Sequence, residues 1–335
     1  MSKVLVSIIV PIYNAHKYLD KCLKSLQHQS EKHFEVIMID DGSTDNSVEI
    51  GQRYTIADKR FKLIQQINSG PSTARNKGIE YSRGEYIVFL DADDYIEQNM
   101  LEVLLRKAQH TKADIVTCGY KEIGTHKRTL WVNDFKECLN IKSLEDYIKI
   151  ILLTTGGVIW GKIFRANIIK DNGIRFDARF KMCEDQLFNI KSFCYAQKII
   201  SINEYLYCYR RDNINSLSNN GYINNLQNQL AIQQEIEQVL EQYLGYRETT
   251  NQCLARRLYQ YIISVLYESY KNNDKEIRYI IKEDYIKEKL KSFIPIGIRE
   301  KVTLKVLLTN NIFLIKTMFR CQKIIASIKG YIKIE

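Results

Sequence analysis

Apolar runs alternate with amphipathic segments along the first part of the chain. Strand-forming residues predict strands over 6–10, 34–39, 61–65 and 86–90, and Pro11 is expected to end the first of them. Helical spacing of apolar residues follows that strand, at Tyr18, Leu19, Cys22, Leu23 and Leu26. Helices are also expected from about Asn46 and around Arg75, because turn residues precede both segments. This alternation favours a parallel sheet covered by helices.

The strand predicted over 86–90 leads directly into three carboxylates, Asp91, Asp93 and Asp94. Its continuous apolar run is typical of a strand that is buried on both faces. The carboxyl ends of such strands border the ligand crevice of an open α/β sheet. Two interpretations compete here. One is a solvated acidic turn before a helix that begins near Glu97, and the other is a site for a divalent cation and a nucleotide.

Polar residues follow each of the four predicted strands: Tyr13 and Asn14, Asp40 and Asp41, Asn68, and Asp91 with Asp93. A nucleotide crevice needs such a row, since base, ribose and phosphates require different partners along one edge. No G-x-G-x-x-G follows the first strand and no G-x-x-x-x-G-K-[ST] occurs, so neither a dinucleotide fold nor a P-loop is expected. Phosphate charge would be met by a metal on the carboxylates and by a cation such as Arg75.

Four motifs in this order resemble the family 2 glycosyltransferases with a GT-A fold: VSIIVPIYN at 6–14, IDDGSTD at 39–45, ARNKG at 74–78 and LDADD at 90–94. The D-x-D alone would be weak support, whereas the ordered set is specific. The resemblance covers residues 1–110 densely. It implies a Rossmann-like mixed, mainly parallel sheet with flanking helices, followed by a helical C-terminal region.

The resemblance also implies roles for the nucleotide-binding residues. Pro11 and Tyr13 are similar to the wall against a uracil base, and Asp41 to the carboxylate that accepts from the base N3–H. Arg75 corresponds to the cation near the uracil and phosphates. Considered alone, Tyr13 could instead be a packing residue, and Arg75 a surface cation on a helix.

By the same resemblance, Asp91 contacts the ribose and the metal shell, and Asp93 is the direct ligand of Mn²⁺ or Mg²⁺. The metal would offset the charge that develops on the departing nucleoside diphosphate. Ala92 between them, with Asn14 and Asn68, completes the nucleotide-sugar site that we predict.

Farther along the chain we expect a helix from Leu101, a strand over 114–120 and helical spacing from Leu144 to Ile151. Two later motifs, VIWGKIFR at 158–165 and CEDQLF at 183–188, resemble the acceptor half of the same family. The resemblance implies that Asp185 is the catalytic base, with Glu184 as the alternative base, because an inverting transfer needs a carboxylate beside the acceptor hydroxyl.

Simpler explanations exist for this acceptor half. Two acids at a helix N-terminus, such as Glu184 and Asp185, could simply interact with the helix dipole. Trp160 could form a platform for an acceptor sugar or belong to the core.

A strand-like segment over 199–209 ends in Arg210 and Arg211. Relatives often place a metal-binding His after the base, but none of the five His residues lies in this segment: His16, His28, His33, His110 and His126. The third protein ligand of the metal is therefore open, and Arg210 or Arg211 could hold the diphosphate instead.

The rest of the chain is predicted to be helical, with one apolar stripe from Ile232 to Tyr243 and another from Leu254 to Val265. A third stripe consists of Leu314, Met318, Cys321, Ile325 and Ile328, with Lys316, Arg320 and Lys323 on the opposite side. This helix could lie on an anionic membrane surface, dock on its neighbours or mediate self-association into a homo-oligomer. The predicted boundaries are 1–110 for the donor half, 111–218 for the acceptor half and 219–335 for the helical region.

Composition bears on where in the cell the protein is expected. The 335 residues carry a net charge of +10, concentrated towards the C-terminus, and the eight cysteines show no paired spacing. Free thiols, no signal peptide and no apolar run of about 20 residues favour a cytoplasmic protein, with peripheral attachment to the cytoplasmic face of a membrane as an addition. We expect no nucleic acid among its partners.

The function expected from these observations is an inverting transfer of a sugar, with UDP-sugar as the expected donor. The acceptor would be a hydroxyl of a bacterial surface glycan or a lipid-linked acceptor, such as capsule, exopolysaccharide, lipopolysaccharide or teichoic acid. A non-catalytic nucleotide-sugar-binding or scaffold protein is the alternative. A phosphatase with an aspartyl nucleophile is disfavoured, because its D-x-D would follow the first strand rather than the fourth.

Overall fold

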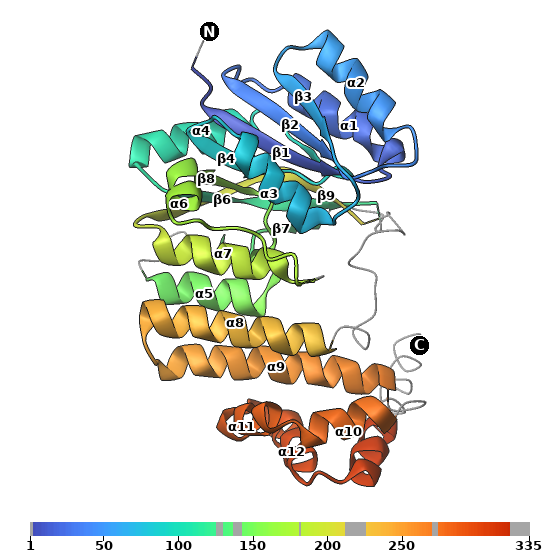
Figure 1. The fold of residues 1–335 in the computed structure, drawn as a ribbon. Helices are drawn as coiled ribbons and strands as arrows, with labels where there is room; N and C mark the ends of the chain where they lie inside the picture. The colour runs from blue at the N-terminus through green and yellow to red at the C-terminus, as the bar shows by residue number, and fades with distance from the viewer. Residues whose placement is uncertain are drawn as a thin grey trace, which may run out of the picture. The chain divides into compact units, whose positions relative to one another are not determined.

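The structure is a computed structural model that describes residues 3–124, 130–136, 143–180, 182–211, 226–269 and 274–321. The chain forms two compact units, Met1–Ser216 and Leu217–Glu335. The first is an α/β unit and the second is helical (Figure 1). The functional division of the first unit into donor and acceptor halves stays a prediction.

One sheet organises the first unit. Its strands are β1 (Val6–Ile12), β2 (Phe34–Asp40), β3 (Phe61–Gln65), β4 (Tyr86–Phe89), β5 (Tyr95–Ile96), β6 (Ile115–Ile123), β7 (Leu130–Val132), β8 (Lys162–Arg165) and β9 (Ile199–Arg210). The order is β3-β2-β1-β4-β8-β6-β9-β5, and β7 pairs with β6. The strands β3, β2, β1 and β4 are parallel, while β8 is antiparallel to both of its neighbours. The mixed, mainly parallel sheet predicted from the sequence is confirmed.

Seven α-helices accompany this sheet among the described residues: α1 (His16–Gln27), α2 (Ser47–Ala57), α3 (Pro71–Tyr81), α4 (Met100–Thr111), α5 (Leu144–Leu153), α6 (Ala166–Asp171) and α7 (Glu184–Tyr195). Contacts join α3 to β1 and β2, and α4 to β6. The helix expected near Glu97 begins later, at Met100. The two residues of β5 intervene and pair with β9, a long-range contact that no local pattern predicts.

Pro11 does not end the first strand, contrary to the prediction. β1 continues to Ile12, and Pro11 pairs with Ile39 of β2. In a strand, the N–H and C=O groups of one residue point to one side, and those of the next residue point to the other side. Ile9 C=O accepts a hydrogen bond from Leu90 N–H, so the backbone groups of Ile9 point towards β4. The backbone nitrogen of Pro11, two residues further on, therefore points to the β4 side as well. Ile9 is the last residue of β1 that pairs with β4, so Pro11 has no partner strand on that side. Its missing N–H removes no ladder hydrogen bond.

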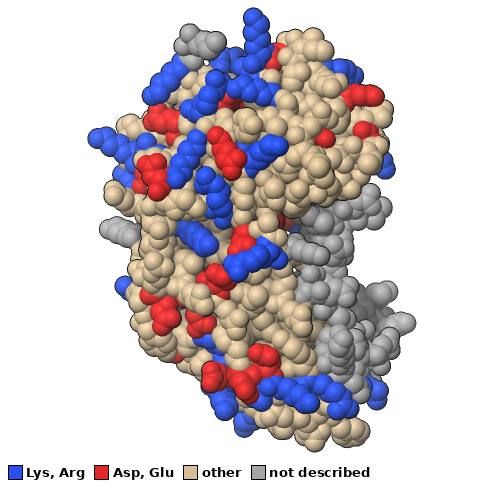
Figure 2. Space-filling model, in the orientation of Figure 1, with Lys and Arg blue, Asp and Glu red and all other residues tan. Residues whose placement is uncertain are grey.

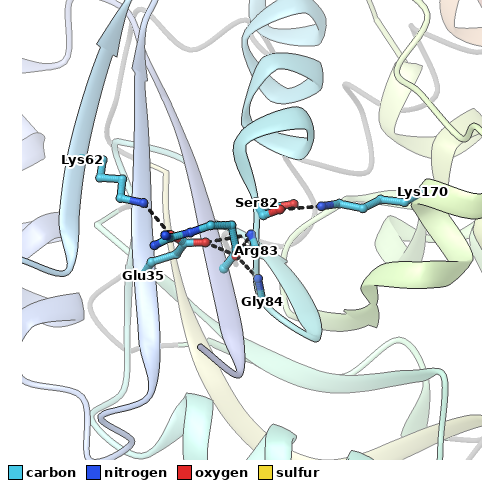
Figure 3. A network of polar contacts seen from close by, with 7 residues as sticks. Glu35, Lys62, Ser82, Arg83, Gly84 and Lys170 are labelled. Carbon is cyan, nitrogen blue, oxygen red and sulfur yellow. Dashed lines mark hydrogen bonds and ion pairs between the residues drawn. The ribbon is translucent and has the colours of Figure 1, made fainter. Parts of the chain in front are cut away.

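A buried carboxylate on β2 joins three strands of the sheet (Figure 3). Glu35 accepts from Ser7 Oγ at 2.8 Å, from Lys62 Nζ at 2.9 Å and from Arg83 Nη2 at 2.8 Å. Burial alone would raise the pKa of Glu35, but these hydrogen bonds outweigh it and lower the pKa to about 2. Gly84 completes the network: its N–H donates to Ser7 Oγ, and a Cβ there would lie 2.5 Å from the Ser7 backbone nitrogen.

In the part that the structure describes, the second unit contains α8 (Leu226–Leu244), α9 (Glu248–Ser269), α10 (Asp274–Lys282), α11 (Asp284–Ser292), α12 (Gly297–Leu308) and a helical stretch over 312–321. Figure 1 shows α8 and α9 running side by side. The first two predicted stripes lie on these helices, and Ile236, Leu240, Leu258 and Ile262 are buried.

The third stripe is offset from its prediction. Ile315 and Phe319 are the buried residues of the stretch 312–321, whereas Leu314 and Cys321 are exposed. Ile325, Ile328 and Lys323 lie outside the described residues. No helix in the described part of the chain is long and apolar enough to cross a membrane.

Candidate functional site

Asp41 at the end of β2 is held by the turn that precedes α3. Its Oδ1 accepts from Ser69 N–H at 2.8 Å and its Oδ2 from Gly70 N–H at 2.7 Å. Gly42 makes this approach possible: its φ is +75°, and a Cβ there would lie 3.0 Å from the Asn68 backbone nitrogen. Two of the expected nucleotide-binding residues, Asp41 and Asn68, therefore lie on loops that pack together.

The end of β1 meets the same loops. The Asn14 N–H donates to Ser43 Oγ at 3.0 Å, and Asn14 Oδ1 accepts from Thr44 N–H at 2.8 Å. Asn14 thus ties the loop after β1 to the loop after β2. Beside it, the Tyr13 side chain is 54% exposed and Pro11 is half-buried. The exposure of Tyr13 argues against the packing alternative and leaves an aromatic ring open to a ligand.

Arg75 is the centre of the site. Its Nη2 donates to Asp91 Oδ1 at 3.0 Å, and its Nη1 donates to Glu184 Oε1 at 3.2 Å and to Asp185 Oδ1 at 3.1 Å. The guanidinium is buried, at 5.3 Å from the centre of the Phe176 ring. Arg75 is therefore no surface cation. It brings together the acid that follows β4 and the two acids that begin α7.

The position of Arg75 depends on close packing of α3 against the sheet. Gly78, one turn further along α3, lies directly on β1, where a Cβ would come within 2.3 Å of Ile9 Cγ2. The cluster is unbalanced in charge, because one guanidinium faces three carboxylates.

Asp185 lies in the first turn of α7, and its Oδ2 accepts from Ile159 N–H at 3.3 Å. Burial raises the pKa of Asp185, the guanidinium of Arg75 opposes this, and the carboxylates of Glu184 and Asp91 raise the pKa further. The result is a pKa of about 7. A carboxylate with such a pKa is an effective proton acceptor near neutral pH.

Two buried polar residues that the sequence analysis missed hold the turn that contacts Asp185. Lys162 Nζ donates to Val158 O at 2.6 Å, and Asn189 Nδ2 donates to the same oxygen at 2.8 Å. Burial lowers the pKa of Lys162 to about 8. A lysine inside the apolar run 158–164 was the available signal, since lysine is rarely buried without a polar partner.

The three carboxylates after β4 have different environments. Asp94 is buried, and its carboxylate accepts from Tyr207 Oη at 2.6 Å and from Arg210 N–H at 2.7 Å. Burial and the neighbouring Asp93 and Asp91 raise its pKa well above the usual range. Asp94 is therefore a structural residue, whereas Asp91 and Asp93 are half-buried and Ala92 between them is buried.

Arg210 and Arg211 diverge at the end of β9. Arg210 Nε donates to the Asp93 carbonyl oxygen at 3.0 Å, and its guanidinium lies 5.0 Å from the centre of the Tyr18 ring. Arg211 forms an ion pair with Glu122 of β6 at 2.9 Å. Of the two, Arg210 is the one that the structure places beside the D-x-D.

Trp160 is buried in an aromatic stack. The centre of its ring lies 4.4 Å from the ring centre of Tyr207 and 5.2 Å from that of Tyr209, and both pairs are stacked. The ring of Tyr120 is nearly perpendicular to it, with the two ring centres 4.8 Å apart. Little of the ring is left for a sugar, so the packing favours the core alternative for Trp160.

The carboxylates of Asp91 and Asp93 are of the kind that binds a divalent cation. Carboxylate oxygens are the ligands that Mg²⁺ and Mn²⁺ accept, and Mg²⁺ commonly takes one or two carboxylates plus phosphate oxygens. No group of three or more His, Cys, Asp or Glu side chains suited to a metal occurs in the part of the chain that the structure describes.

Solved structures show the same fold. Staphylococcus aureus TarS 1–349 in complex with UDP-GlcNAc matches with a TM-score of 0.72 at 23% identity, over 95% of this chain and 91% of that one. The same protein in complex with UDP gives a TM-score of 0.70. This likeness confirms the expected GT-A fold with a helical C-terminal region.

Sequence comparisons identify the family. The uncharacterized glycosyltransferase EpsJ of Bacillus subtilis (strain 168) is 35% identical over 64% of this chain and 63% of its own length. Glycosyltransferase GlyG of Streptococcus pneumoniae is 32% identical over 62% of this chain and 71% of its own length. The chain thus spans less than two thirds of EpsJ. Residues 7–172 match the model of glycosyl transferase family 2, and the chain belongs to that family.

Proposed function

We propose that this protein is an inverting glycosyltransferase that moves a sugar from a UDP-sugar to a hydroxyl of a bacterial surface glycan or of a lipid-linked acceptor. One observation carries the proposal. Arg75 forms ion pairs both with Asp91 of the donor motif and with Glu184 and Asp185 of the acceptor motif. A donor sugar bound at Asp91 would therefore lie beside the carboxylate that must activate the acceptor.

The relatives support the donor and the acceptor class. TarS, whose fold this chain shares, has been solved with UDP and with UDP-GlcNAc. A protein from Staphylococcus aureus that is 31% identical over 61% of this chain is named poly(ribitol-phosphate) beta-N-acetylglucosaminyltransferase TarS. A UDP-linked hexose or N-acetylhexosamine and a polymeric acceptor are the corresponding proposals here.

In the proposed mechanism each group acts from its observed position. The exposed Tyr13 ring and the fixed carboxylate of Asp41 bind the base. Asp185 takes the proton of the acceptor hydroxyl, and that oxygen attacks the anomeric carbon from the face opposite the diphosphate. Arg210, beside Asp93, meets the charge on the departing diphosphate.

Asp91 and Asp93 would hold the Mn²⁺ or Mg²⁺ that the fold family implies. When bound, the ion supplies electrostatic stabilisation of the diphosphate leaving group. Arg75 remains with the carboxylates and keeps Asp185 oriented.

A panel of nucleotide sugars, with release of UDP or GDP as the readout, tests the proposal. We expect turnover with a UDP-sugar that depends on Mn²⁺ or Mg²⁺. Asp93→Ala should abolish the metal-dependent donor affinity measured by calorimetry, while the matched variant Asp58→Ala, at a carboxylate paired with Arg60, should not change it. Binding without turnover under any condition would instead support a non-catalytic nucleotide-sugar-binding protein.

A further inference from the structure

Helix α12 is apolar on two opposite faces. Thr303, Leu304 and Leu307 are buried in the core of the second unit. On the opposite face Ile298 is 81% exposed and Val302 is 50% exposed. Large apolar side chains that are exposed together on one face of a helix often mark an interaction site, so this outer face needs an explanation.

Lysines share that outer face. Ile298, Lys301, Val302 and Lys305 follow the spacing i, i+3, i+4, i+7, which places them on one stripe of the helix, and all four are exposed. The stripe thus combines branched aliphatic side chains with two cations. Long lysine side chains beside apolar residues are typical of helices at a membrane interface.

The next helical stretch, 312–321, repeats the arrangement. Its buried residues are Ile315 and Phe319, and Phe313 is 75% exposed. Lys316 and Arg320 lie three and seven positions after Phe313, on the same side of the helix as that ring. Two successive helices therefore each turn an apolar side chain and two cations away from the core.

The segment before α12 adds two more apolar side chains. Ile294 is 63% exposed and Ile296 is 72% exposed. Their backbones are held in place, because Ile294 N–H donates to Gln252 Oε1 at 2.9 Å and Ile296 N–H donates to Glu300 Oε2 at 2.5 Å. The outward direction of these side chains is thus part of an ordered structure.

The charged residues of this stretch are mostly basic. Glu300 is the sole acidic residue between positions 291 and 321, and it is engaged by Ile296 N–H and by Arg256 at 3.2 Å. Figure 2 shows Lys and Arg side chains, together with a group of Asp and Glu side chains, on the surface of the second unit. The net charge of the stretch 291–321 is therefore positive.

We propose that the apolar–basic surface formed by Ile296, Ile298, Lys301, Val302 and Lys305 docks on a membrane that contains anionic lipid. The isoleucines would enter the headgroup boundary and the lysines would meet lipid phosphates. A second copy of the chain is a poorer occupant, because a two-fold contact places the same patch on both partners and so sets lysine against lysine. This inference is independent of the proposed transferase activity.

Flotation of the full chain with vesicles tests it. We expect binding to vesicles of phosphatidylcholine with phosphatidylglycerol, much weaker binding to phosphatidylcholine alone, and loss of binding at high salt. The double variant Lys301→Glu/Lys305→Glu should lower the partition coefficient by roughly tenfold or more, since each cation contributes about 1 kcal/mol near an anionic surface. Ile298→Ser/Val302→Ser should lower it as well.

Matched controls separate the surface from general charge and apolarity. Lys24→Glu/Lys59→Glu makes the same change in net charge at exposed lysines of the first unit, and Ile56→Ser removes an isoleucine that is 85% exposed there. Both controls should bind vesicles like the unmodified protein, and all variants should keep their melting temperature. The proposal is overturned if the unmodified protein ignores anionic vesicles, or if the surface variants bind as well as the controls. Loss of a dimer in sedimentation by Ile298→Ser/Val302→Ser, without vesicle binding, would assign the surface to a second copy.

Discussion

Arg75 Nη1 donates a hydrogen bond to Asp185 Oδ1 across 3.1 Å, although the two residues are 110 positions apart in the chain. The contact joins α3, which follows the loops of the donor site, to the first turn of α7. It has an electrostatic consequence, because the buried guanidinium counteracts the burial that raises the pKa of Asp185.

Removing that cation should shift the pH dependence of the reaction. In Arg75→Gln, Asp185 loses the charge that lowers its pKa, so the acidic limb of kcat/KM should move to higher pH. Arg75→Lys keeps the charge and should shift the limb less. The unfolding free energy of Arg75→Gln should fall by about 3 kcal/mol, because carboxylates are left without their buried partner. A limb at unchanged pH would show that Arg75 does not set the pKa of the base.

Asp185→Asn should slow turnover by roughly a hundredfold or more and leave donor affinity nearly unchanged, because the amide is a far weaker base. In the unmodified protein, Asp185 accepts a proton only when ionised. Its pKa of about 7 therefore predicts that kcat/KM falls as the pH drops through 7.

The residual activity of Asp185→Asn should lack this acidic limb. Glu184→Gln serves as the control, because Glu184 also forms an ion pair with Arg75. Only 12% of its side chain is exposed, against 21% for Asp185, so it is the less accessible of the two carboxylates. Near-normal turnover by Asp185→Asn with loss of activity in Glu184→Gln would reverse the assignment of the base.

Lys162→Met should reduce kcat about tenfold with little change in the KM for the donor, because the turn that donates to Asp185 loses the ammonium that binds Val158 O. Methionine fills a similar volume, so the melting temperature should change little. The second readout is the acidic limb, which should move to higher pH since a nearby cation is lost. A fall in melting temperature with an unshifted limb would indicate a purely structural role.

Glu35→Gln should destabilise the first unit by about 2 kcal/mol at neutral pH, because its hydrogen-bond donors lose a buried charged acceptor, while the exposed Lys62 and Arg83 are solvated. The pKa of Glu35 is lowered from 4.5 to about 2 in the folded protein. Its contribution is therefore complete above pH 4.5 and is lost as the pH falls towards 2. Chemical denaturation at several pH values should show the variant and the unmodified protein converging in acid. A constant gap would contradict this role.

Local patterns in the sequence were sufficient to locate the strands of the donor half. The strand β3 has the predicted bounds, and the acidic motifs follow β2 and β4 as expected. These features are local: an apolar run of strand formers and the polar residues next to it lie within a few positions of one another. Short elements such as β5 were missed, since two residues carry no periodicity.

Packing gives the three acids after β4 different environments. The sequence alone does not distinguish the three acids Asp91, Asp93 and Asp94. In the structure the hydroxyl of Tyr207, 113 positions away, donates a hydrogen bond to the carboxylate of Asp94. The sequence left Trp160 open between a sugar platform and a core residue, and the stacking of Tyr207 and Tyr209 on its ring favours the core.

The sequence by itself determined the order of strands and helices in the donor half and the row of polar residues at the strand ends, because both depend on neighbouring residues. Only the tertiary structure decided that Arg75 is a buried hub rather than a surface cation, and that Lys162 supports the turn beside Asp185. Such pairings depend on how distant segments pack, and burial then gives these few charges their strength and their shifted pKa values.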